Sequence, residues 1–436
     1  MSEDHSSESR RLSRREILRK GAAATTVAGL GLTGAAGSAT ATKKKEDAIP
    51  IDGPSRITEP GYYVLTQDIV STGEFNLLVL DEIELGVGVD DVTIDGQGFT
   101  LDGAGKSAVG IRGGSFAFGN NNVTIKNICI TGCTQYGIYL ASNREATIQN
   151  VAVTHCENGI WWDNTLDSTL EGCTLKQNAQ GIFTTEGNFR NTFVRNQFIK
   201  NGRAAFLVEN TDDFLFKNNR IEHNDEGFII SDLGGKSLVT GNHFYRNGFG
   251  AGIGGPFSPV DGNEVTIRRN QFVENENEGL EISEAAGFTI EKNSMLRNGT
   301  QGIRFAIDVN EMTVSKNLIR GNGDDGILLR NSDRNEIVKN KVLNNGGDGI
   351  ELRAAGDQED RGSDNNVIRK NIIKGNAGLP IRIDEFSTGN IIEKNRTDEK
   401  NGGAKGGDGD ESNSDGNKGD DKDDRNDGND DTCRVE

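Results

Sequence analysis

Two neighbouring carboxylates, Asp324 and Asp325, are the side chains of this sequence whose type and spacing best suit catalysis. They lie in the segment Asn322-Gly-Asp-Asp-Gly326. A pair of carboxyl groups can supply the general acid and the general base for cleavage of a glycosidic bond, with a water molecule between them. We therefore take Asp324 and Asp325 as candidate catalytic residues. An acidic residue also precedes a glycine at other turns of this chain, namely at Glu226, Glu278 and Asp348.

Cation binding is the second chemistry that this spacing suggests. Asp325 and Asp348 stand at the same turn position of neighbouring repeats, and stacked strands lie ~5 Å apart. Two carboxylates at this distance repel each other unless they turn into water or share a cation. Carboxylate and carbonyl oxygens are the ligands that Ca²⁺ prefers. No cofactor is identified from the sequence, but calcium is a candidate, with Asp325 and Asp348 as its candidate ligands.

The cysteines form a third group. Cys133 and Cys156 are 23 residues apart (156 − 133), and so occupy similar positions in neighbouring repeats. They could form a disulfide outside the cell, stack as thiols in the core, or bind copper or zinc together with His155. The sequence leaves these alternatives open. The remaining cysteines are Cys129, Cys173 and Cys433.

These residues sit in a short repeat that fills the chain from about residue 122 to 395. One half reads Gly-apolar-x-apolar, and neighbouring copies such as Gly137 and Gly159 are 22 residues apart (159 − 137). The other half reads apolar-x(1–2)-Asn-x-apolar. Asparagine fills it at positions 127, 150, 196, 219, 242, 270, 293, 317, 340, 371 and 395.

Each repeat predicts one coil of a parallel β-helix. Two short stretches rich in Ile, Val, Phe and Thr alternate in the manner of strands, and the turns between them are too short to contain a helix. We expect about a dozen coils, with the recurring Asn forming a ladder of amides inside the turns. The predicted inward residues of the first strand include Ile138, Ile160, Ile182, Phe206 and Phe228. Those of the second include Cys129, Phe198, Ile221, Phe244 and Phe272.

The outward position of the Gly-apolar strand is the most informative feature. Successive coils place Tyr139, Trp161 and Phe183 there, then Leu207 and Ile229, and later the charged residues Glu281, Arg304, Glu351 and Arg382. Bulky apolar side chains on an exterior face are not explained by packing of the core, and aromatic rings beside carboxylates hold sugar rings in many proteins. The alternative is that a loop or the N-terminal segment covers them. The candidate ligand-binding residues are Tyr139, Trp161, Phe183, Asp163, Glu186, Glu209 and Asp232.

This pattern, preceded by Val92-Thr-Ile-Asp-Gly-Gln-Gly-Phe-Thr-Leu-Asp-Gly103, resembles the right-handed parallel β-helix proteins of the pectin-lyase-like superfamily. It is most similar to the NosD-like branch that is common in haloarchaea, over roughly residues 50–396. The resemblance implies an all-β solenoid. It also implies polysaccharide lyase, hydrolase or epimerase activity in many relatives and copper handling in some. The Gly-His-Gly and Arg-Ile-Lys motifs of polygalacturonase-type hydrolases are absent, so the resemblance does not carry a full catalytic set.

Both ends of the chain depart from the repeat. Ser13-Arg14-Arg15-Glu-Ile-Leu-Arg19 and Ala39-Thr-Ala41 resemble a twin-arginine signal with its cleavage site, so residues 1–41 predict export. Residues 42–90 are predicted to cap the first coil, and 91–396 to form the solenoid. Residues 397–436 carry 14 acidic and 6 basic side chains and almost nothing apolar, which predicts a disordered acidic tail.

Composition narrows the choice of partners. A net charge of −19 over 436 residues opposes binding to nucleic acid or to an anionic membrane. No other run approaches the ~18 apolar residues of a membrane span. The leading prediction is an exported, non-catalytic binder of polysaccharide or of a cell-surface polymer. The alternatives are a polysaccharide lyase, hydrolase or epimerase, and a NosD-like copper-handling protein.

Overall fold

The computed structural model describes residues 47–81, 88–114, 119–184, 187–209, 211–255, 264–356 and 361–398, together with Cys433. All of them belong to one compact unit, Lys43–Glu436. The signal predicted over residues 1–41 and nearly all of the predicted acidic tail lie outside the described residues. Across the described ranges, no helix has the length and apolar character needed to cross a bilayer.

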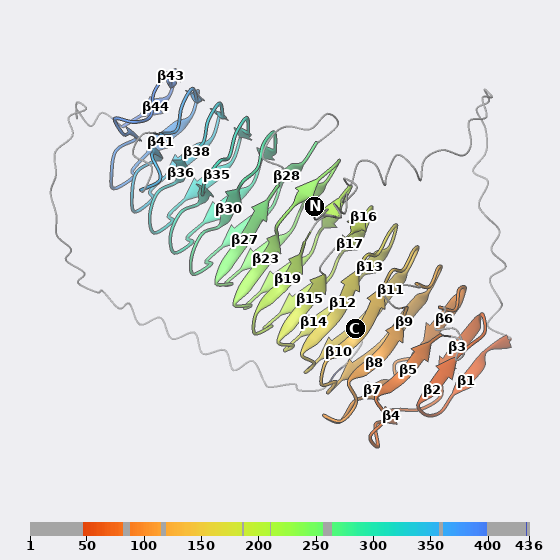
Figure 1. The fold of residues 1–436 in the computed structure, drawn as a ribbon. Helices are drawn as coiled ribbons and strands as arrows, with labels where there is room; N and C mark the ends of the chain where they lie inside the picture. The colour runs from red at the N-terminus through yellow and green to blue at the C-terminus, as the bar shows by residue number, and fades with distance from the viewer. Residues whose placement is uncertain are drawn as a thin grey trace, which may run out of the picture. The chain divides into compact units, whose positions relative to one another are not determined.

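One parallel sheet of 14 strands carries the Gly-apolar-x-apolar motif, with one strand from each coil (Figure 1). Equal positions of neighbouring coils are paired, as Ile138 is with Ile160. The sequence predicted about a dozen coils, and the fold is confirmed as an all-β parallel solenoid. The strands are β2 (Ser55–Ile57), β5 (Asn76–Leu80), β8 (Val109–Gly113), β10 (Tyr136–Ala141), β12 (Asn158–Asp163), β15 (Gln180–Thr184), β19 (Ala204–Val208), β23 (Glu226–Ile230), β27 (Phe249–Gly254), β30 (Leu280–Ser283), β33 (Ile303–Phe305), β36 (Ile327–Arg330), β39 (Ile350–Arg353) and β42 (Ile381–Ile383).

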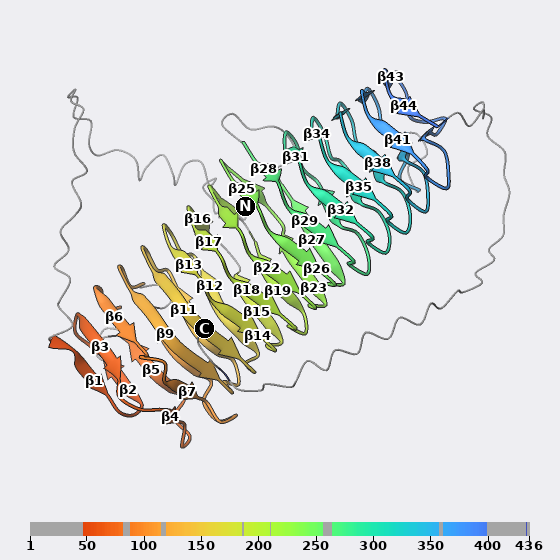
Figure 2. The same cartoon turned by 180° about the vertical axis from the view of Figure 1, so that it is seen from behind.

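A second parallel sheet, of 27 strands, receives two strands from most coils (Figure 2). The sequence predicted one strand for this half of the repeat, but the turn at the asparagine divides it into two short ones. The earlier strands are β1 (Ile49–Ile51), β3 (Gly61–Leu65), β4 (Ile69–Val70), β6 (Val92–Asp95), β7 (Thr100–Asp102), β9 (Thr124–Thr131), β11 (Thr147–Thr154), β13 (Thr169–Glu171), β14 (Thr174–Lys176), β17 (Thr192–Val194), β18 (Gln197–Ile199), β21 (Leu215–Lys217), β22 (Arg220–Glu222), β25 (Leu238–Thr240) and β26 (His243–Tyr245). The later ones are β28 (Thr266–Arg268), β29 (Gln271–Val273), β31 (Thr289–Glu291), β32 (Ser294–Leu296), β34 (Thr313–Ser315), β35 (Leu318–Arg320), β37 (Glu336–Val338), β38 (Lys341–Leu343), β40 (Val367–Arg369), β41 (Ile372–Lys374), β43 (Ile391–Glu393) and β44 (Arg396–Thr397).

A small third sheet joins three coils beside the apolar part of the 14-stranded sheet. It contains β16 (Asn188–Phe189), β20 (Thr211–Asp212) and β24 (Leu233–Gly234). Residues 42–90 were predicted to cap the first coil, and within them residues 49–80 supply strands to both large sheets. For example, Tyr63 of β3 pairs with Ile94 of β6 in the same register as the later coils.

The asparagine ladder satisfies the buried amides at the turn. Asn270 accepts the backbone N–H of Asn242 at 3.0 Å and donates its side-chain N–H to the carbonyl of Val239 at 2.9 Å. The continuous ladder begins at Asn196, however. The predicted rungs Asn127 and Asn150 do bond each other, Asn150 donating its side-chain N–H to the amide oxygen of Asn127 at 2.8 Å, but they lie outside the register of that ladder. Both have a positive φ, 51° and 52°, and stand one position before the rung. A second ladder, which the sequence reasoning missed, links positions 178, 201, 224, 247, 275, 298, 322, 345 and 376.

The core between the sheets is filled by the predicted inward residues, with one exception. Ile138, Ile160, Phe206 and Phe228 are all fully buried. Cys129 is the exception, because Ile130 is the residue that pairs with Val153 along the inward column. Cys129 faces outward for the same reason that Asn127 misses the ladder: the asparagine of this coil stands one position before the rung, so the predicted register is one residue off.

Candidate functional site

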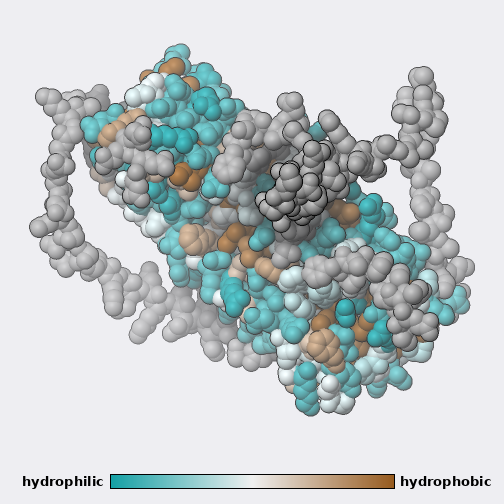
Figure 3. All heavy atoms as spheres, in the orientation of Figure 1, coloured by the Kyte–Doolittle hydropathy of each residue, from teal (hydrophilic) through white to brown (hydrophobic). Residues whose placement is uncertain are grey.

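The outward column of the 14-stranded sheet is continuous across the stack. Tyr139 pairs with Trp161, Trp161 with Phe183, and the column continues through Leu207 to Ile229. This confirms the predicted adjacency of these five residues, which we call the apolar stripe. All five are half-buried. In the space-filling view, hydrophobic residues form patches on a surface that is otherwise mostly hydrophilic (Figure 3).

The aromatic rings of the stripe contact one another. The rings of Tyr139 and Trp161 are stacked with centroids 6.0 Å apart, and Phe183 meets the edge of Trp161 at 4.8 Å. Tyr136 joins them, since its ring lies 5.3 Å from that of Trp161. Burial raises the pKa of the Tyr136 and Tyr139 hydroxyls, so both stay protonated donors. The indole N–H of Trp161 is buried without a hydrogen-bond acceptor among the described residues.

A second outward column runs beside the stripe, three positions earlier in each strand. It pairs Tyr136 with Asn158 and Asn158 with Gln180. The sequence reasoning missed this column, although its fixed spacing from the stripe was available as a signal. The two columns border a hollow of ≈ 340 Å³, lined by Glu157, Asn158, Trp161, Gln180, Phe183, Arg203, Ala204, Leu207 and Glu226. Rings on one side and amide, carboxylate and guanidinium groups on the other can both contact a sugar.

The carboxylates predicted to flank the stripe fall into different environments. Glu209 is exposed and Asp232 is half-buried, so both can reach a ligand. Asp163 is only 2% exposed, which places it beneath the surface rather than on it. Glu186 lies outside the described residues.

Further along the same column most residues are charged, with Gly252 and the buried Leu328 as the exceptions. Glu281 pairs with Arg304 and Glu351 with Arg382 in the strand register, as predicted. Arg304 donates to Glu278 at 2.7 Å and lies 3.2 Å from Glu281. We call Glu281, Arg304, Glu351 and Arg382, with the neighbouring Glu278, Asp325 and Asp348, the charged stripe.

Asp325 has an altered acidity within the charged stripe. Burial is the main cause, and the nearby Asp324 and Glu351 add to it, so that its pKa rises to about 7 despite a hydrogen bond from the Asp348 backbone. A hollow of ≈ 470 Å³ lies here, lined by Asp324, Asp325, Gly346, Gly347, Asp348, Glu351, Arg353, Ala377, Gly378 and Arg382. The two predicted catalytic residues therefore share one hollow. Asp324, however, accepts a hydrogen bond from Gln301 at 2.5 Å.

The calcium pair does not fit a cation. Asp325 and Asp348 do occupy neighbouring coils, and Asp325 accepts the backbone N–H of Asp348 at 2.7 Å. The carboxylate of Asp348 is already ion-paired with Arg382, so its negative charge already has a cationic partner. The described ranges contain no group of three or more His, Cys, Asp or Glu side chains that could hold a metal ion. We therefore derive no chemistry through calcium.

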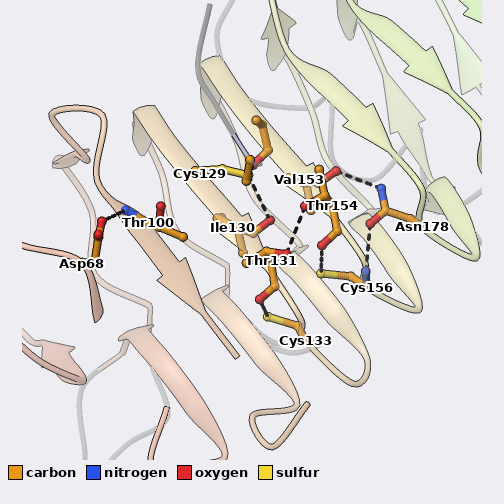
Figure 4. The surroundings of a disulfide bond; sticks show 12 residues. Asp68, Thr100, Cys129, Ile130, Thr131, Cys133, Val153, Thr154, Cys156 and Asn178 are labelled. Atoms are coloured by element: carbon orange, nitrogen blue, oxygen red, sulfur yellow. Dashed lines mark hydrogen bonds between the residues drawn. A yellow bond between two sulfur atoms is a disulfide. The ribbon is translucent and has the colours of Figure 1, made fainter. Parts of the chain in front are cut away.

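The cysteines are arranged as a disulfide and buried thiols (Figure 4). Cys129 is bonded to Cys433 across 304 residues, a pairing that the sequence reasoning did not weigh. Cys133 and Cys156 are free and buried. Each thiol donates to a carbonyl of its own coil, Cys133 to Thr131 at 3.8 Å and Cys156 to Thr154 at 3.4 Å. The hydrogen bond with Cys156 and burial both raise the pKa of the Cys133 thiol.

The copper or zinc set of Cys133, Cys156 and His155 does not converge. Cys156 is buried, whereas the adjacent His155 is exposed at a turn with a φ of 54°. A raised thiol pKa also disfavours the thiolate that binds soft metals. The stacked buried thiols match the predicted alternative in which these sulfur atoms occupy the core.

Comparison with solved structures identifies proteins of similar fold. The A-module of the Azotobacter vinelandii mannuronan C-5 epimerase AlgE4 is 18% identical, with a TM-score of 0.50 over 77% of this chain and 91% of that one. Tailspike protein 3 of bacteriophage CBA120 is 12% identical, with a TM-score of 0.42 over 82% of this chain and 52% of that one. No curated protein matches the sequence.

The family comparison agrees with the geometry of the coils. A family model described as the right-handed beta helix region matches residues 113–255 and 257–418. These two segments contain most of the stacked strands and both stripes. The chain therefore belongs to the right-handed β-helix family.

Proposed function

We propose that this protein is exported and binds polysaccharide along the outward face of the 14-stranded sheet, with the apolar stripe as the main contact. The observation that carries the proposal is the row of contacting rings, Tyr136, Tyr139, Trp161 and Phe183, beside a hollow with polar walls. Sugar rings offer apolar faces and hydroxyl groups together, and this arrangement can contact both.

Repetition along the stack supports a polymer rather than a small molecule as the ligand. The stripe advances by one residue per coil, ~4.8 Å each time. A linear chain lying along the stack would meet similar contacts at each step. That the A. vinelandii neighbour is named a mannuronan epimerase is consistent with this choice of ligand class.

Export rests on the sequence alone, through Arg14 and Arg15 of the predicted signal. Replacing both by Lys should keep the precursor inside the cell, because the receptor reads the arginine pair. Immunoblots of cell and medium fractions measure this. Secretion of the double variant at the wild-type level would remove the export assignment.

Binding is tested with purified protein against neutral and acidic polysaccharides, with Trp161→Ala as the variant. The affinity for the polymer that binds the wild type should fall at least tenfold, because a central aromatic anchor contributes ~2 kcal/mol or more. Glu209→Gln, which changes an exposed carboxylate at the edge of the stripe, should weaken binding less. An unchanged affinity in Trp161→Ala would mean that the stripe is not the binding surface.

A polysaccharide lyase, hydrolase or epimerase is the second candidate, and one observation favours it. A carboxyl group with a pKa of about 7, as at Asp325, can both donate and accept a proton near neutral pH. The same polysaccharides are assayed for new reducing ends, unsaturated ends and changed sugar configuration. Activity that survives in Trp161→Ala with a raised KM but disappears in Asp325→Asn would establish catalysis. Binding without any product supports the first proposal. Copper handling draws no support from the described thiols.

A further inference from the structure

A row of basic side chains runs along one corner of the 27-stranded sheet. Each of six consecutive coils contributes one residue, always at the position immediately before the asparagine ladder. All six are exposed and have φ values between 56° and 59°. Backbone hydrogen bonds keep them in register, from Lys292 to the coil of Lys316 and from there to the coil of Lys339. We call this set the basic ladder: Arg269, Lys292, Lys316, Lys339, Lys370 and Lys394.

Backbone conformation does not select these residues. A positive φ favours Gly and Asn, and other side chains are strained there. The earlier coils follow this preference at the same corner, with Arg195 as the exception; they carry Asn127, Asn150, Gly172, Asn218 and Gly241. The change to Lys and Arg over six successive coils therefore needs another cause.

Internal ion pairing does not supply that cause. Within the described part of the chain, Lys292 lies 3.1 Å from Glu291 and Lys394 lies 3.8 Å from Glu393. The other four cations have no carboxylate within ion-pair distance among the described residues. Like charges that repeat every ~4.8 Å repel one another. The cations of the row therefore repel one another, and an anion lying along it would offset this repulsion.

The surface next to the ladder is hollowed. Lys316 is followed by the rung Asn317 and then by Leu318, which borders a hollow of ≈ 530 Å³. The lining combines apolar and cationic side chains: Leu296, Arg297, Leu318, Arg320, Gly321 and Asn344. Apolar contacts beside cations suit a ligand that carries both ring faces and negative groups.

We infer that the basic ladder is a second polymer-binding surface, specific for an acidic polysaccharide that carries a carboxylate or sulfate on its repeating units. The row is one cation wide and spans ~24 Å over five coil steps, which suits a single extended chain. A nucleic acid duplex would bring a broader anionic surface against a protein of net charge −19. The inference rests on the proposed function in taking the polymer to be a polysaccharide, but it concerns a different sheet from the apolar stripe.

The test measures binding of dextran sulfate to the full chain at several salt concentrations. In the triple variant Lys316→Glu, Lys339→Glu and Lys370→Glu we expect at least ~10-fold weaker binding and a shallower dependence of log K on log salt, because fewer counterions are released. The matched control, Lys200→Glu, Lys217→Glu and Lys236→Glu, makes the same change in net charge at exposed lysines of earlier coils. It should lose clearly less affinity. Equal losses in the two variants, or wild-type binding by the ladder variant, would overturn the inference.

A second variant separates binding from folding. Lys316→Asn, Lys339→Asn and Lys370→Asn introduce the residue that the early coils use at this corner. The melting temperature should be unchanged or raised, since Asn tolerates the positive φ, while dextran sulfate binding falls. A lowered melting temperature with intact binding would instead assign the ladder a structural role. Binding of unsulfated polymers to Trp161→Ala tests the apolar stripe separately. Each of the two proposed binding surfaces can therefore be disproved without affecting the other.

Discussion

The apolar stripe and the charged stripe occupy the same column of the same sheet, yet they differ completely in side-chain chemistry. Strand pairing continues from Tyr139 through Ile229 to Glu281 and Arg382 without a change of register. The inward side chains hold the backbone in both parts, and the asparagine rungs add to this from Asn196 onward. The outward position is left free by the fold, and the identity of the residue there can therefore follow function.

The two stripes also differ in how they respond to their surroundings. In the apolar stripe, aromatic rings contact one another, and no charged side chain takes part in these contacts. In the charged stripe, burial raises the pKa of Glu281 and of Asp325, while Arg304 and Arg382 hold the neighbouring carboxylates. We therefore expect the charged stripe to respond to pH and salt, and the apolar stripe to respond to neither.

The largest effect is expected just behind the apolar stripe, at Trp162. Trp162 is fully buried, whereas the adjacent Trp161 faces outward. Trp162→Ala should lower the free energy of unfolding by ~3–5 kcal/mol, as emptying an aromatic core position does. Urea denaturation measures this loss. If Trp162→Ala lost less unfolding free energy than Trp161→Ala, then Trp161 would be the inward side chain and Trp162 the outward one.

Trp161→Ala is the matched exterior change and should act on a different quantity. We expect the free energy of unfolding to change by no more than about 1 kcal/mol, and polysaccharide binding to weaken by ~2 kcal/mol. Calorimetric binding and a thermal melt of the same sample separate the two. A large loss of stability would instead mean that another part of the chain covers the stripe.

Much of the fold was predictable because its signals are repeated. The Gly-apolar-x-apolar motif identified one strand per coil and placed Ile138 inward and Tyr139 outward correctly. The repeat predicted the wrong register in the first coils, where the asparagine occupies a different position from that in the later coils. An asparagine suits both the rung and the positive-φ position before it, so Asn127 and Cys129 were each assigned one residue out of register.

The site was less predictable, because it depends on contacts between coils. The outward column of Tyr139, Trp161 and Phe183 followed from the spacing alone. The burial of Asp163 and the ion pair that occupies Asp348 depend on neighbours that no local pattern shows. The disulfide from Cys129 joins the solenoid to the end of the chain, and the spacing of the cysteines carries no signal for such a pairing.

Breaking the ion pair of the charged stripe should give a smaller change. Arg382→Ala leaves the buried carboxylate of Asp348 without its guanidinium partner. The guanidinium itself is about half exposed, so water replaces part of the contact, and we expect a loss of ~1–2 kcal/mol in stability. Added salt should reduce the difference between variant and wild type. The same salt series on Trp161→Ala should show no such convergence, and convergence in both would remove the electrostatic distinction between the stripes.

The smallest effect concerns the acidity of Asp325. Its pKa in the folded protein, about 7, lies above that of an unfolded aspartate, so its protonation favours the folded state. This contribution is complete below the unfolded pKa of ~3.9 and is lost as the pH rises through about 7.

Glu351→Gln removes one of the negative neighbours that raise the pKa of Asp325. The pKa should fall, and the loss of stability between these limits should become smaller and end at a lower pH. Chemical denaturation at a series of pH values measures the change, and Asp325→Asn serves as the reference in which this contribution is absent. Burial is the larger cause of the raised pKa and remains in Glu351→Gln. The pH-dependent loss of stability in this variant should therefore be smaller than in the wild type and larger than in Asp325→Asn. A profile identical to that of the wild type would mean that Glu351 does not act on Asp325.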